Sequence, residues 1–361
     1  MLSVSRKQDR RAVFCSSARV FWGAERSMVS LAGHIGEYES TVVVSCSPAV
    51  TRAVASDSPG SKVVEINNSR PRLIRAVMAG LATLKYSNSA IIIFDIDLLP
   101  ITVFTKWVHA LRGNQVVFDL HDFLPTRWGR FKLRVCLLFT DKVVAVSNFV
   151  AVQVPKRIPV SVLARPMSDI DFVDESGFHS NALGVFGRIS RDKNFDRIGQ
   201  VLDALPERFK IVVRGEAVSQ SDKAYLAEVK EDLASRGQLG RVVFEGHVDR
   251  KNLYSGVGAL LLLNDAEPSG RVVAEAQLAG CPPFVSCKGG ASEYVEDGMS
   301  GFVYNEVPDQ SLLHGVESLF RTEKEYNYMR VKCRAYAAEK YDPVRQTNSY
   351  RSALTVLRNG G

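Results

Sequence analysis

Short apolar runs rich in β-branched residues alternate with segments of helical periodicity along most of this chain. This alternation constrains the fold more than any other feature. Strands that alternate with helices form parallel sheets covered by helices on both faces. In the first half, the expected strands are residues 12–15, 41–45, 62–66, 90–94, 115–120, 142–147 and 160–163. The pattern therefore predicts an α/β fold with a doubly wound parallel sheet.

The second half repeats the same organisation. Its expected strands are residues 183–186, 210–214, 241–245, 259–263 and 284–286. A chain of 361 residues exceeds the usual size of a single hydrophobic core, so we expect two α/β domains. The periodicity is interrupted near residues 165–180, by Pro166, Ser168, Asp169, Asp171, Asp174 and Gly177. We place the domains at 1–168 and 169–335, followed by a helical tail at 336–361.

The richest chemical pattern follows the apolar run 259–263. Glu267 lies in the next loop, Ser269 is suited to cap a helix, and Gly270 would let a ligand approach the backbone. The amides of that helix start would favour an anion such as a diphosphate. Glu275 lies about one and a half turns into the helix. Both carboxylates are therefore expected at the carboxyl end of the strand, where open α/β sheets bind ligands.

The ordered set Glu267, Glu275, Gly289-Gly290 and Glu293 resembles the signature of retaining glycosyltransferase family four, the glycosyl transferases group 1. This resemblance implies the GT-B fold, with two Rossmann-like domains facing a cleft. It implies that 1–168 binds the acceptor, that 169–335 binds a nucleoside-diphosphate sugar, and that the tail 336–361 crosses back to the first domain. In this role Glu267 contacts the transferred sugar and Glu275 the ribose. The acceptor would be a glycan, a lipid-linked glycan or a small molecule, as in polysaccharide biosynthesis.

Two basic side chains follow the expected strand 183–186. Arg188 can form a fork to phosphate oxygens, and Lys193 can place a point charge nearby. The family carries Arg, a short loop and Lys followed by Gly, whereas this chain has Asn194 in the last place. The resemblance assigns the diphosphate to Arg188 and Lys193, so that no metal and no tightly bound cofactor is expected. A purely structural role for both residues is the alternative.

Two first-domain motifs also resemble the family. Gly23, preceded by Trp22 where the family has another glycine, would lie beside the donor, and an ordinary strand-to-helix turn is the alternative. His121 ends the expected strand 115–120 at the kind of position where the family histidine contacts the transferred sugar. The alternative is a histidine that only fixes its loop by hydrogen bonding.

Weaker signals lie elsewhere. Gly246 and Val248 are expected only as neighbours of the base. Asp95 and Asp97 are spaced like the Mg²⁺ or Mn²⁺ ligands of another glycosyltransferase fold, but a strand-end cap is the favoured interpretation. The six cysteines show no metal-ligand spacing and are expected to be cytoplasmic thiols.

Charge is unevenly divided between the halves. Residues 1–180 hold 22 Lys and Arg against 15 Asp and Glu, and the remainder is balanced at 24 against 24. The first half therefore suits an anionic partner. Residues 126–139 would form a helix with Trp128, Phe131 and Val135 towards one side, and basic residues flank another helix at 70–85. Such helices can lie on an anionic membrane surface. Burial of their apolar side chains inside the domain is slightly favoured over membrane binding.

No apolar run reaches 18 residues and the start of the sequence has no apolar signal core, so we expect neither a transmembrane anchor nor a secretion signal. The expected location is the cytoplasm, with peripheral contact at the inner face of the membrane as an addition, and no nucleic-acid partner. Three other functions stay open: a phosphorylase, an epimerase, or a non-catalytic protein that binds nucleotide sugars. A nicotinamide site is disfavoured because no Gly-any-Gly-any-any-Gly turn follows a strand.

Overall fold

The computed structural model describes residues 11–19, 21, 23–36, 40–167, 170, 173 and 177–355. These residues form two compact units. The first runs to Pro166 and resumes at Asp342, and the second is Met167–Tyr341. The expected boundary residues Ser168, Asp169, Asp171 and Asp174 lie outside the described residues, as does Trp22.

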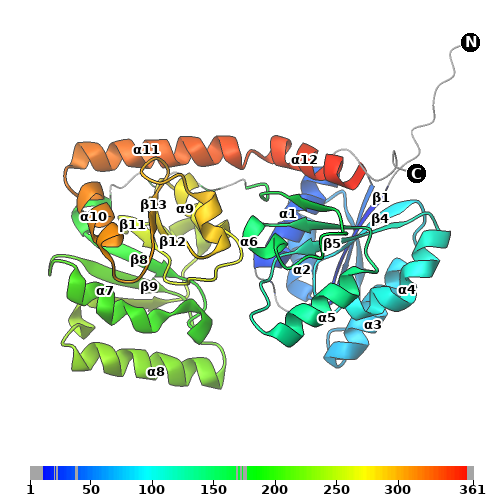
Figure 1. Cartoon of the computed structure of the whole chain (residues 1–361), viewed down its shortest axis with the longest axis horizontal. Helices are drawn as coiled ribbons and strands as arrows, with labels where there is room; N and C mark the ends of the chain where they lie inside the picture. The colour runs from blue at the N-terminus through cyan, green and yellow to red at the C-terminus, as the bar shows by residue number, and fades with distance from the viewer. Residues whose placement is uncertain are drawn as a thin grey trace, which may run out of the picture. The chain divides into compact units, whose positions relative to one another are not determined.

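The first unit contains a seven-stranded parallel sheet in the order β3-β2-β1-β4-β5-β6-β7 (Figure 1). The order reverses between β1 and β4, which defines a doubly wound sheet. Its strands are β1 (Arg11–Ser16), β2 (Ser40–Ser45), β3 (Lys62–Glu65), β4 (Ser89–Ile93), β5 (Gln115–Leu120), β6 (Lys142–Ala145) and β7 (Val160–Val162). The central strands are buried on both faces, as their continuous apolar runs predict.

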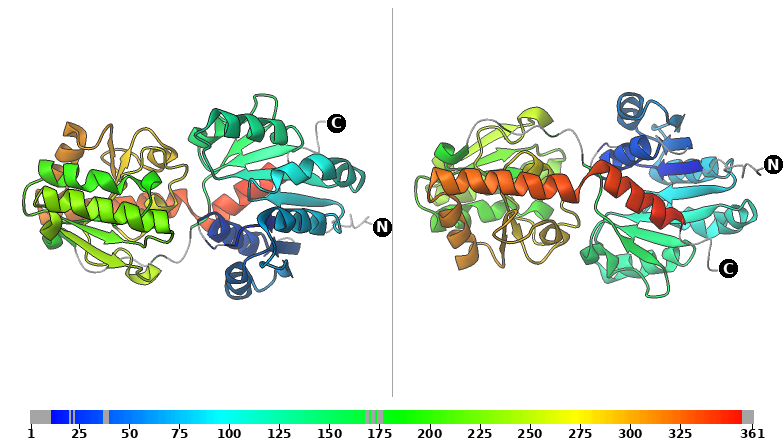
Figure 2. Two further views of the ribbon diagram at one scale, coloured as in Figure 1. Left: turned by 90° about the horizontal axis from the view of Figure 1, so that it is seen from below. Right: turned by 90° about the horizontal axis from the view of Figure 1, so that it is seen from above.

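Helices cover both faces of this sheet, and each face has its own core. One core joins the sheet to α1 (Gly23–Gly36), α2 (Pro48–Asp57) and α12 (Pro343–Thr355), with Phe14 and Tyr350 among its buried side chains. The other joins it to α3 (Arg72–Thr83), α4 (Leu99–Leu111), α5 (Arg127–Leu137) and the short α6 (Asn148–Ala151). Figure 2 shows the helices of each unit from two further sides.

The second unit repeats the design with a six-stranded parallel sheet in the order β10-β9-β8-β11-β12-β13. Its strands are β8 (Ala182–Phe186), β9 (Lys210–Arg214), β10 (Val242–Gly246), β11 (Ala259–Leu261), β12 (Pro283–Ser286) and β13 (Phe302–Tyr304). Its helices are α7 (Ile198–Ala204), α8 (Gln220–Ser235), α9 (Arg271–Leu278), α10 (Gln310–Leu319) and α11 (Glu323–Lys340). The predicted fold class, two doubly wound parallel α/β domains, is confirmed.

Candidate functional site

The strand order of the second sheet reverses between the adjacent strands β8 and β11. At such a switch point, the loops that follow the two strands turn to opposite faces of the sheet and leave a crevice between them. The loop after β8 carries Arg188 and Lys193, and the loop after β11 carries Glu267. Two of the predicted motifs therefore meet at the place where parallel sheets bind ligands.

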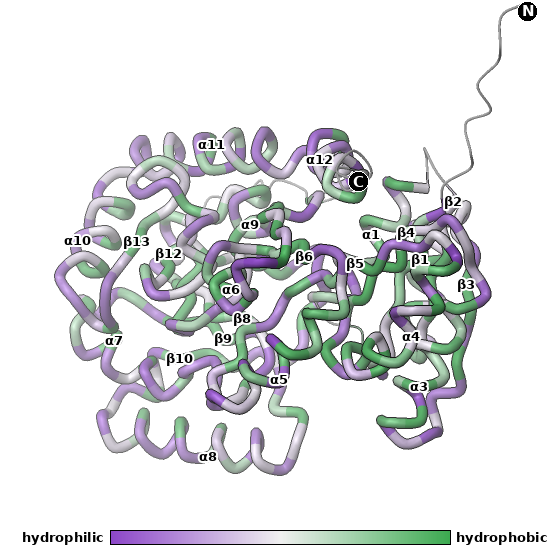
Figure 3. The backbone as a smooth tube through the Cα atoms, turned by 45° about the vertical axis from the view of Figure 1, so that its right-hand side comes forward, coloured by the Kyte–Doolittle hydropathy of each residue, from purple (hydrophilic) through white to green (hydrophobic). Residues whose placement is uncertain are grey.

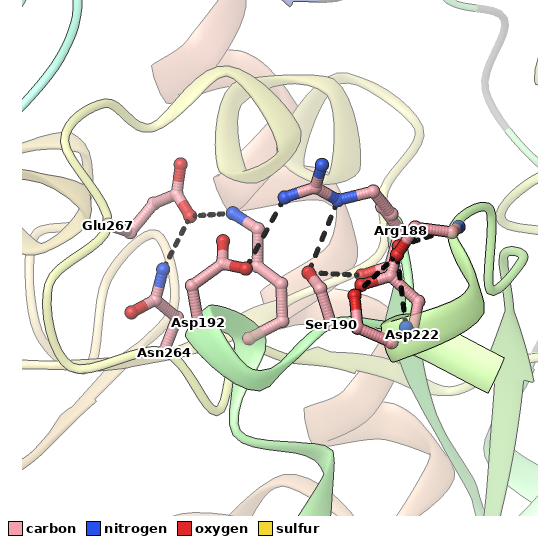
Figure 4. Close-up of polar contacts among 9 residues, drawn as sticks. Arg188, Ser190, Asp192, Asp222, Asn264 and Glu267 are labelled. Carbon is pink, nitrogen blue, oxygen red and sulfur yellow. Dashed lines mark hydrogen bonds and ion pairs between the residues drawn. The ribbon is translucent and has the colours of Figure 1, made fainter. Parts of the chain in front are cut away.

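Lys193 and Glu267 are in direct contact. Lys193 Nζ lies 2.6 Å from Glu267 Oε2, and Asn264 Nδ2 donates a hydrogen bond to the same oxygen at 3.0 Å. Figure 4 shows Glu267 and Asn264 side by side. The Lys193 and Glu267 side chains are 27% and 14% exposed, so this pair remains partly accessible to solvent. Because solvent reaches this ion pair, the Lys193 ammonium and the Glu267 carboxylate can each exchange their mutual contact for a contact to a ligand.

Arg188 belongs to the same loop but makes different contacts. Its Nε donates to Ser190 Oγ at 3.3 Å, and its Nη2 lies 3.4 Å from Asp192 Oδ1 (Figure 4). Nearby, Asn194 adopts the left-handed conformation with φ 55° and ψ 39° and donates from Nδ2 to Leu263 O at 3.3 Å. Glycine reaches this conformation most easily, and asparagine is among the few other residues that adopt it. Asn194 thus supplies the turn that the family forms with glycine.

Glu275 is buried in α9, where two arginines hold its carboxylate. Arg250 Nη2 and Arg271 Nε lie 3.2 and 3.1 Å from Glu275 Oε1. A carboxylate fixed in this way is a preorganised acceptor for hydroxyl groups. The neighbouring glycine pair is also placed for packing: Gly290 N donates to Glu267 O at 2.7 Å, and a Cβ on Gly289 would lie 2.9 Å from Glu267 N.

Two predictions for this loop are corrected. Ser269 is not the helix cap, because the N-cap of α9 is Gly270 and no side chain caps the helix. Nor does Gly270 leave space for a ligand, since a Cβ there would lie 2.2 Å from Cγ of Tyr294. The absence of a side chain at Gly270 instead lets the tyrosine ring pack against the backbone.

Parts of this chain are similar to known proteins. The model of the family "Glycosyl transferases group 1" matches residues 173–339. The second unit is therefore similar to this family over most of its length. Glycogen synthase from Thermus thermophilus is 29% identical over 185 residues, which are 51% of this chain and 41% of that protein. Glycogen synthase from Pseudomonas paraeruginosa is 31% identical over 183 residues, 48% of this chain and 34% of its own length. The chain thus spans well under half of each relative.

The likeness in fold extends to the first unit. The crystal structure of Anabaena HepE in complex with UDP and glucose has a TM-score of 0.80 and 18% sequence identity, covering 96% of this chain and 100% of that one. At this level of identity the match concerns the fold alone. The chain therefore has the GT-B fold that the resemblance implied.

Gly246 and Val248, the other predicted residues of the second unit, lie in and just after β10. Gly246 ends β10 with φ 72°, and its carbonyl oxygen accepts from Gly215 N at 2.8 Å. Gly215 must itself be a glycine, because a Cβ there would lie 1.8 Å from Gly187 O. Val248 is half-buried and His247 exposed. These glycines shape the loops at the carboxyl edge of the sheet, as turn chemistry alone would require.

In the first unit, His121 follows β5 and lies against a buried carboxylate. Its Nε2 is 2.7 Å from Asp119 Oδ1, and its ring centroid is 5.2 Å from that of Phe94. Asp119 also pairs with Arg165 and accepts a hydrogen bond from the Tyr350 hydroxyl at 2.6 Å. Burial alone would raise the pKa of Asp119, but Arg165 and His121 outweigh it and hold that pKa below its usual value.

Sequence reasoning missed Asp119, Arg165 and Tyr350 as partners of His121. The available signal was Asp119 itself, an acid between Phe118 and Leu120 in a strand that is otherwise apolar. A charged residue at a fully buried strand position needs a partner of opposite charge. Gly23, the other predicted residue of this unit, is the first residue of α1, and its carbonyl accepts from Ser27 Oγ at 3.0 Å.

Asp95 and Asp97 make contacts typical of a strand-end cap. Asp95 accepts hydrogen bonds from Ser17 N at 2.6 Å and from Asp97 N at 2.7 Å. Asp97 forms an ion pair with Arg72. Burial raises the pKa of Asp95, although the hydrogen bonds from Ser17 oppose that shift. Both carboxylates are thus engaged by groups of the first unit, as the favoured interpretation predicted.

Proposed function

We propose that this protein is a retaining glycosyltransferase that moves a sugar from a UDP-linked donor to a hydroxyl group of an acceptor. The observation that carries the proposal is the Lys193–Glu267 contact at the β8/β11 switch point, within the residues that match the model of glycosyl transferases group 1. It places one cation and one carboxylate side by side, which suits the junction between a sugar and a diphosphate. The crystal structures of HepE with UDP and glucose and with UDP-glucose favour uridine as the nucleoside.

Donor binding is assigned to the second unit. Arg188 and Lys193 hold the diphosphate by charge-assisted hydrogen bonds, which are roughly twice as strong as neutral ones. Arg188 exchanges its long contact to Asp192 for phosphate oxygens, and Lys193 moves within reach of the phosphate next to the sugar. Glu275 accepts hydrogen bonds from ribose hydroxyls while Arg250 and Arg271 keep its orientation. Ser269, Gly246 and Val248 are further donor contacts of the second unit, and Gly23 is the donor contact assigned to the first unit.

Transfer is assigned to Glu267 and His121. Glu267 accepts hydrogen bonds from the sugar and orients the face on which the acceptor attacks. The acceptor oxygen bonds to the anomeric carbon as the bond from that carbon to the phosphate oxygen breaks, and the leaving phosphate takes the hydroxyl proton. Because this front-face substitution keeps the anomeric configuration, it needs no enzyme nucleophile. Lys193 and Arg188 stabilise the charge that develops on the diphosphate, a role that divalent metals have in other transferases.

The acceptor is assigned to the first unit. We propose a glycan hydroxyl, on a lipid-linked or soluble acceptor, as in polysaccharide biosynthesis. The protein then works in the cytoplasm, in peripheral contact with the inner face of the membrane. The basic excess of the first half supports an anionic partner there, since an attractive field raises the rate of encounter.

The test is a transfer assay with a panel of UDP, GDP and ADP sugars and glycan acceptors, with the product followed by proton NMR. We expect a product with the same anomeric configuration as the donor, formed from a UDP sugar and unaffected by EDTA. An inverted product would overturn retention, and loss of transfer in EDTA would overturn metal independence. Nucleotide binding without turnover on any acceptor would favour a binding protein, and a phosphate-dependent reaction would favour a phosphorylase.

A further inference from the structure

Helix α4 of the first unit buries Leu99 with three polar residues and exposes several large apolar side chains. Thr102, Thr105 and His109 face the interior, whereas Phe104, Trp107 and Leu111 are 80%, 76% and 87% exposed. A surface helix normally orients the other way, with its apolar stripe towards the core. Buried contacts of His109 hold the helix in this orientation: His109 Nε2 lies 3.3 Å from Thr83 Oγ1, and His109 Nδ1 lies 3.2 Å from Asn114 Nδ2.

His109 is suited to this interior position. Burial lowers its pKa to about 4, and the nearby charge of Lys106 acts in the same direction. The ring is therefore neutral near pH 7 and can stay inside the unit. Since the polar stripe of α4 has partners within the protein, the exposed apolar stripe is the side that lacks one among the described residues.

The neighbouring helices extend this apolar surface. Helix α3 packs against α4 at Gly80, where a Cβ would lie 2.6 Å from Ile101 Cγ2, and α4 also packs against α5. Figure 3 shows hydrophobic stretches of the chain where these helices run. The exposed large apolar residues of the three helices and of the residue after α5 are Leu73, Ile74, Val77, Met78, Leu81, Phe104, Trp107, Val108, Leu111, Trp128, Phe131, Val135 and Leu138. We call this set the α3–α5 face.

The exposure of Trp128, Phe131 and Val135 overturns the sequence-based preference for burying them inside the domain. Helix α5 instead buries Leu133 and Leu137. Trp128 stacks on Phe131 with ring centroids 5.5 Å apart, and Lys132 Nζ lies 5.3 Å from the Trp128 centroid. The two exposed rings thus pack against each other beside a basic side chain.

The charged residues within the three helices are all basic, although Arg72 and Lys106 pair with Asp97 and Asp141 outside the helices. Helices α3, α4 and α5 contain seven Lys and Arg residues and no Asp or Glu. Exposed bases stand on or next to the helices at Lys85, Arg112, Arg127, Lys132 and Arg134. Long basic side chains can extend from an apolar surface towards lipid headgroups while their stems remain in contact with it. Tryptophan rings are enriched at that same depth.

We propose that the α3–α5 face docks on an anionic lipid bilayer, with α4 lying in the interface plane. An apolar stripe bordered by bases gains both from burial among acyl chains and from attraction to anionic headgroups. A second copy of the chain fits less well, since two such faces would bring like charges together without an acid on the three helices to pair with them. No described helix is long and apolar enough to cross a membrane. The α3–α5 face belongs to the first unit, whereas the donor residues Lys193 and Glu267 belong to the second.

Sedimentation of the full chain with vesicles tests this proposal. One set of vesicles is phosphatidylcholine alone, and in the other a third of the lipid is phosphatidylglycerol. We expect stronger partition onto the anionic vesicles. Neutralising Arg127→Gln and Lys132→Gln should weaken that partition by roughly ten- to thirtyfold, because each base near the surface contributes about 1 kcal/mol. Phe104→Ser with Trp107→Ser should weaken it on both vesicle types.

The control variants make the same kinds of substitution in the second unit. Lys223→Gln with Lys251→Gln removes two exposed bases, and Tyr328→Gln with Val331→Gln removes two exposed apolar residues from α11. Neither control should change partition. Equal partition of the parent protein onto both vesicle types, or unchanged partition of the α3–α5 face variants, would overturn the proposal. A vesicle-free dimer that Phe104→Ser with Trp107→Ser dissociates would assign the face to a second copy. UDP affinity, measured without vesicles, tests the donor site independently, so that a failure of the membrane proposal can be told apart from a failure of the proposed function.

Discussion

The two units hold their candidate functional side chains in different ways at the same edge of similar sheets. In the second unit, Lys193 and Glu267 form a contact that solvent can reach, and each can turn to a ligand. In the first unit, His121 lies against Asp119, which is completely buried and is shared with Arg165 and Tyr350. The partners of Asp119 come from segments far apart in sequence, the last of them from α12.

An accessible ion pair and a buried charge network suit different roles. Ion pairs that are open to solvent contribute little to stability. The Lys193–Glu267 pair, whose side chains are 27% and 14% exposed, is partly accessible and can therefore be remodelled when a charged ligand binds. A buried charge network is costly to disrupt and therefore fixes geometry. We infer that the second unit gives its charges to the donor, whereas the first uses its charges to hold one imidazole in place. The following predictions test that division.

The largest effect is expected from Asp119→Asn. The change leaves the buried Arg165 guanidinium without its counter-charge, and breaking a buried pair in this way costs about 3 to 5 kcal/mol of the free energy of unfolding. Denaturant unfolding at pH 7 measures it. Because the folded pKa of Asp119 is depressed, its contribution is present above the unfolded pKa and is lost as pH falls through the folded pKa. The parent should thus lose more stability than Asp119→Asn below about pH 4.

Asp97→Asn is the matched control, because the pair of Asp97 with Arg72 also lies in the first unit but is largely exposed. We expect a change of about 1 kcal/mol or less. Similar losses in the two variants would show that burial of Asp119 is not what makes its network different. A stable Asp119→Asn with unaltered transfer would remove both the structural and the positioning role.

The next effect is on donor binding. Lys193→Ala or Arg188→Ala should lose about 1.5 to 3 kcal/mol of UDP-sugar binding or transition-state stabilisation, since each removes a charge-assisted contact to the diphosphate. Titration calorimetry and initial rates measure the two contributions. The free energy of unfolding of Lys193→Ala should fall by only about 1 kcal/mol or less, in contrast to Asp119→Asn.

Arg191→Ala is the control for this pair of variants. Arg191 stands in the same loop, but its guanidinium pairs with Glu228 at 2.6 Å and is mostly exposed. Its removal should leave donor affinity and turnover unchanged. If Lys193→Ala and Arg188→Ala also kept both, the two residues would not belong to the donor site.

Much of the fold followed from periodicity. The bounds of β5 and β9 were predicted to the residue, because a buried parallel strand appears as a continuous apolar run between turn residues. Strand β13 was missed because its three residues stand between Gly301 and Asn305, whereas the three residues of β11 belong to a longer apolar run. The orientation of α4 was also beyond prediction: Thr102, Thr105 and His109 face the interior because of contacts to other segments, against the usual apolar rule.

Some residues of the candidate sites could be predicted from local motifs, and others could not. Lys193 and Glu267 follow strands within local motifs, so their residue types and spacing already indicated phosphate and sugar chemistry, although their roles stay predictions. The Asp119 network could not be found this way, because Tyr350 lies 231 residues away along the chain. Only the folded unit brings α12 to β5, and no local pattern records that approach.

The smallest expected effect separates the two glutamates of the second unit. Glu275→Gln keeps an oxygen that accepts from Arg250 and Arg271 but loses the charge that strengthens its hydrogen bonds to ribose, so affinity for free UDP should fall by about 1 kcal/mol. Glu267→Gln should bind free UDP like the parent and lose turnover, because its partner is the transferred sugar. Calorimetry with UDP and rates at saturating donor distinguish these outcomes. Glu228→Gln, on the exposed pair with Arg191, should change neither quantity. If UDP binds to Glu275→Gln as tightly as to the parent, the ribose assignment is wrong, and if Glu267→Gln loses UDP affinity instead of turnover, the roles of the two carboxylates are reversed.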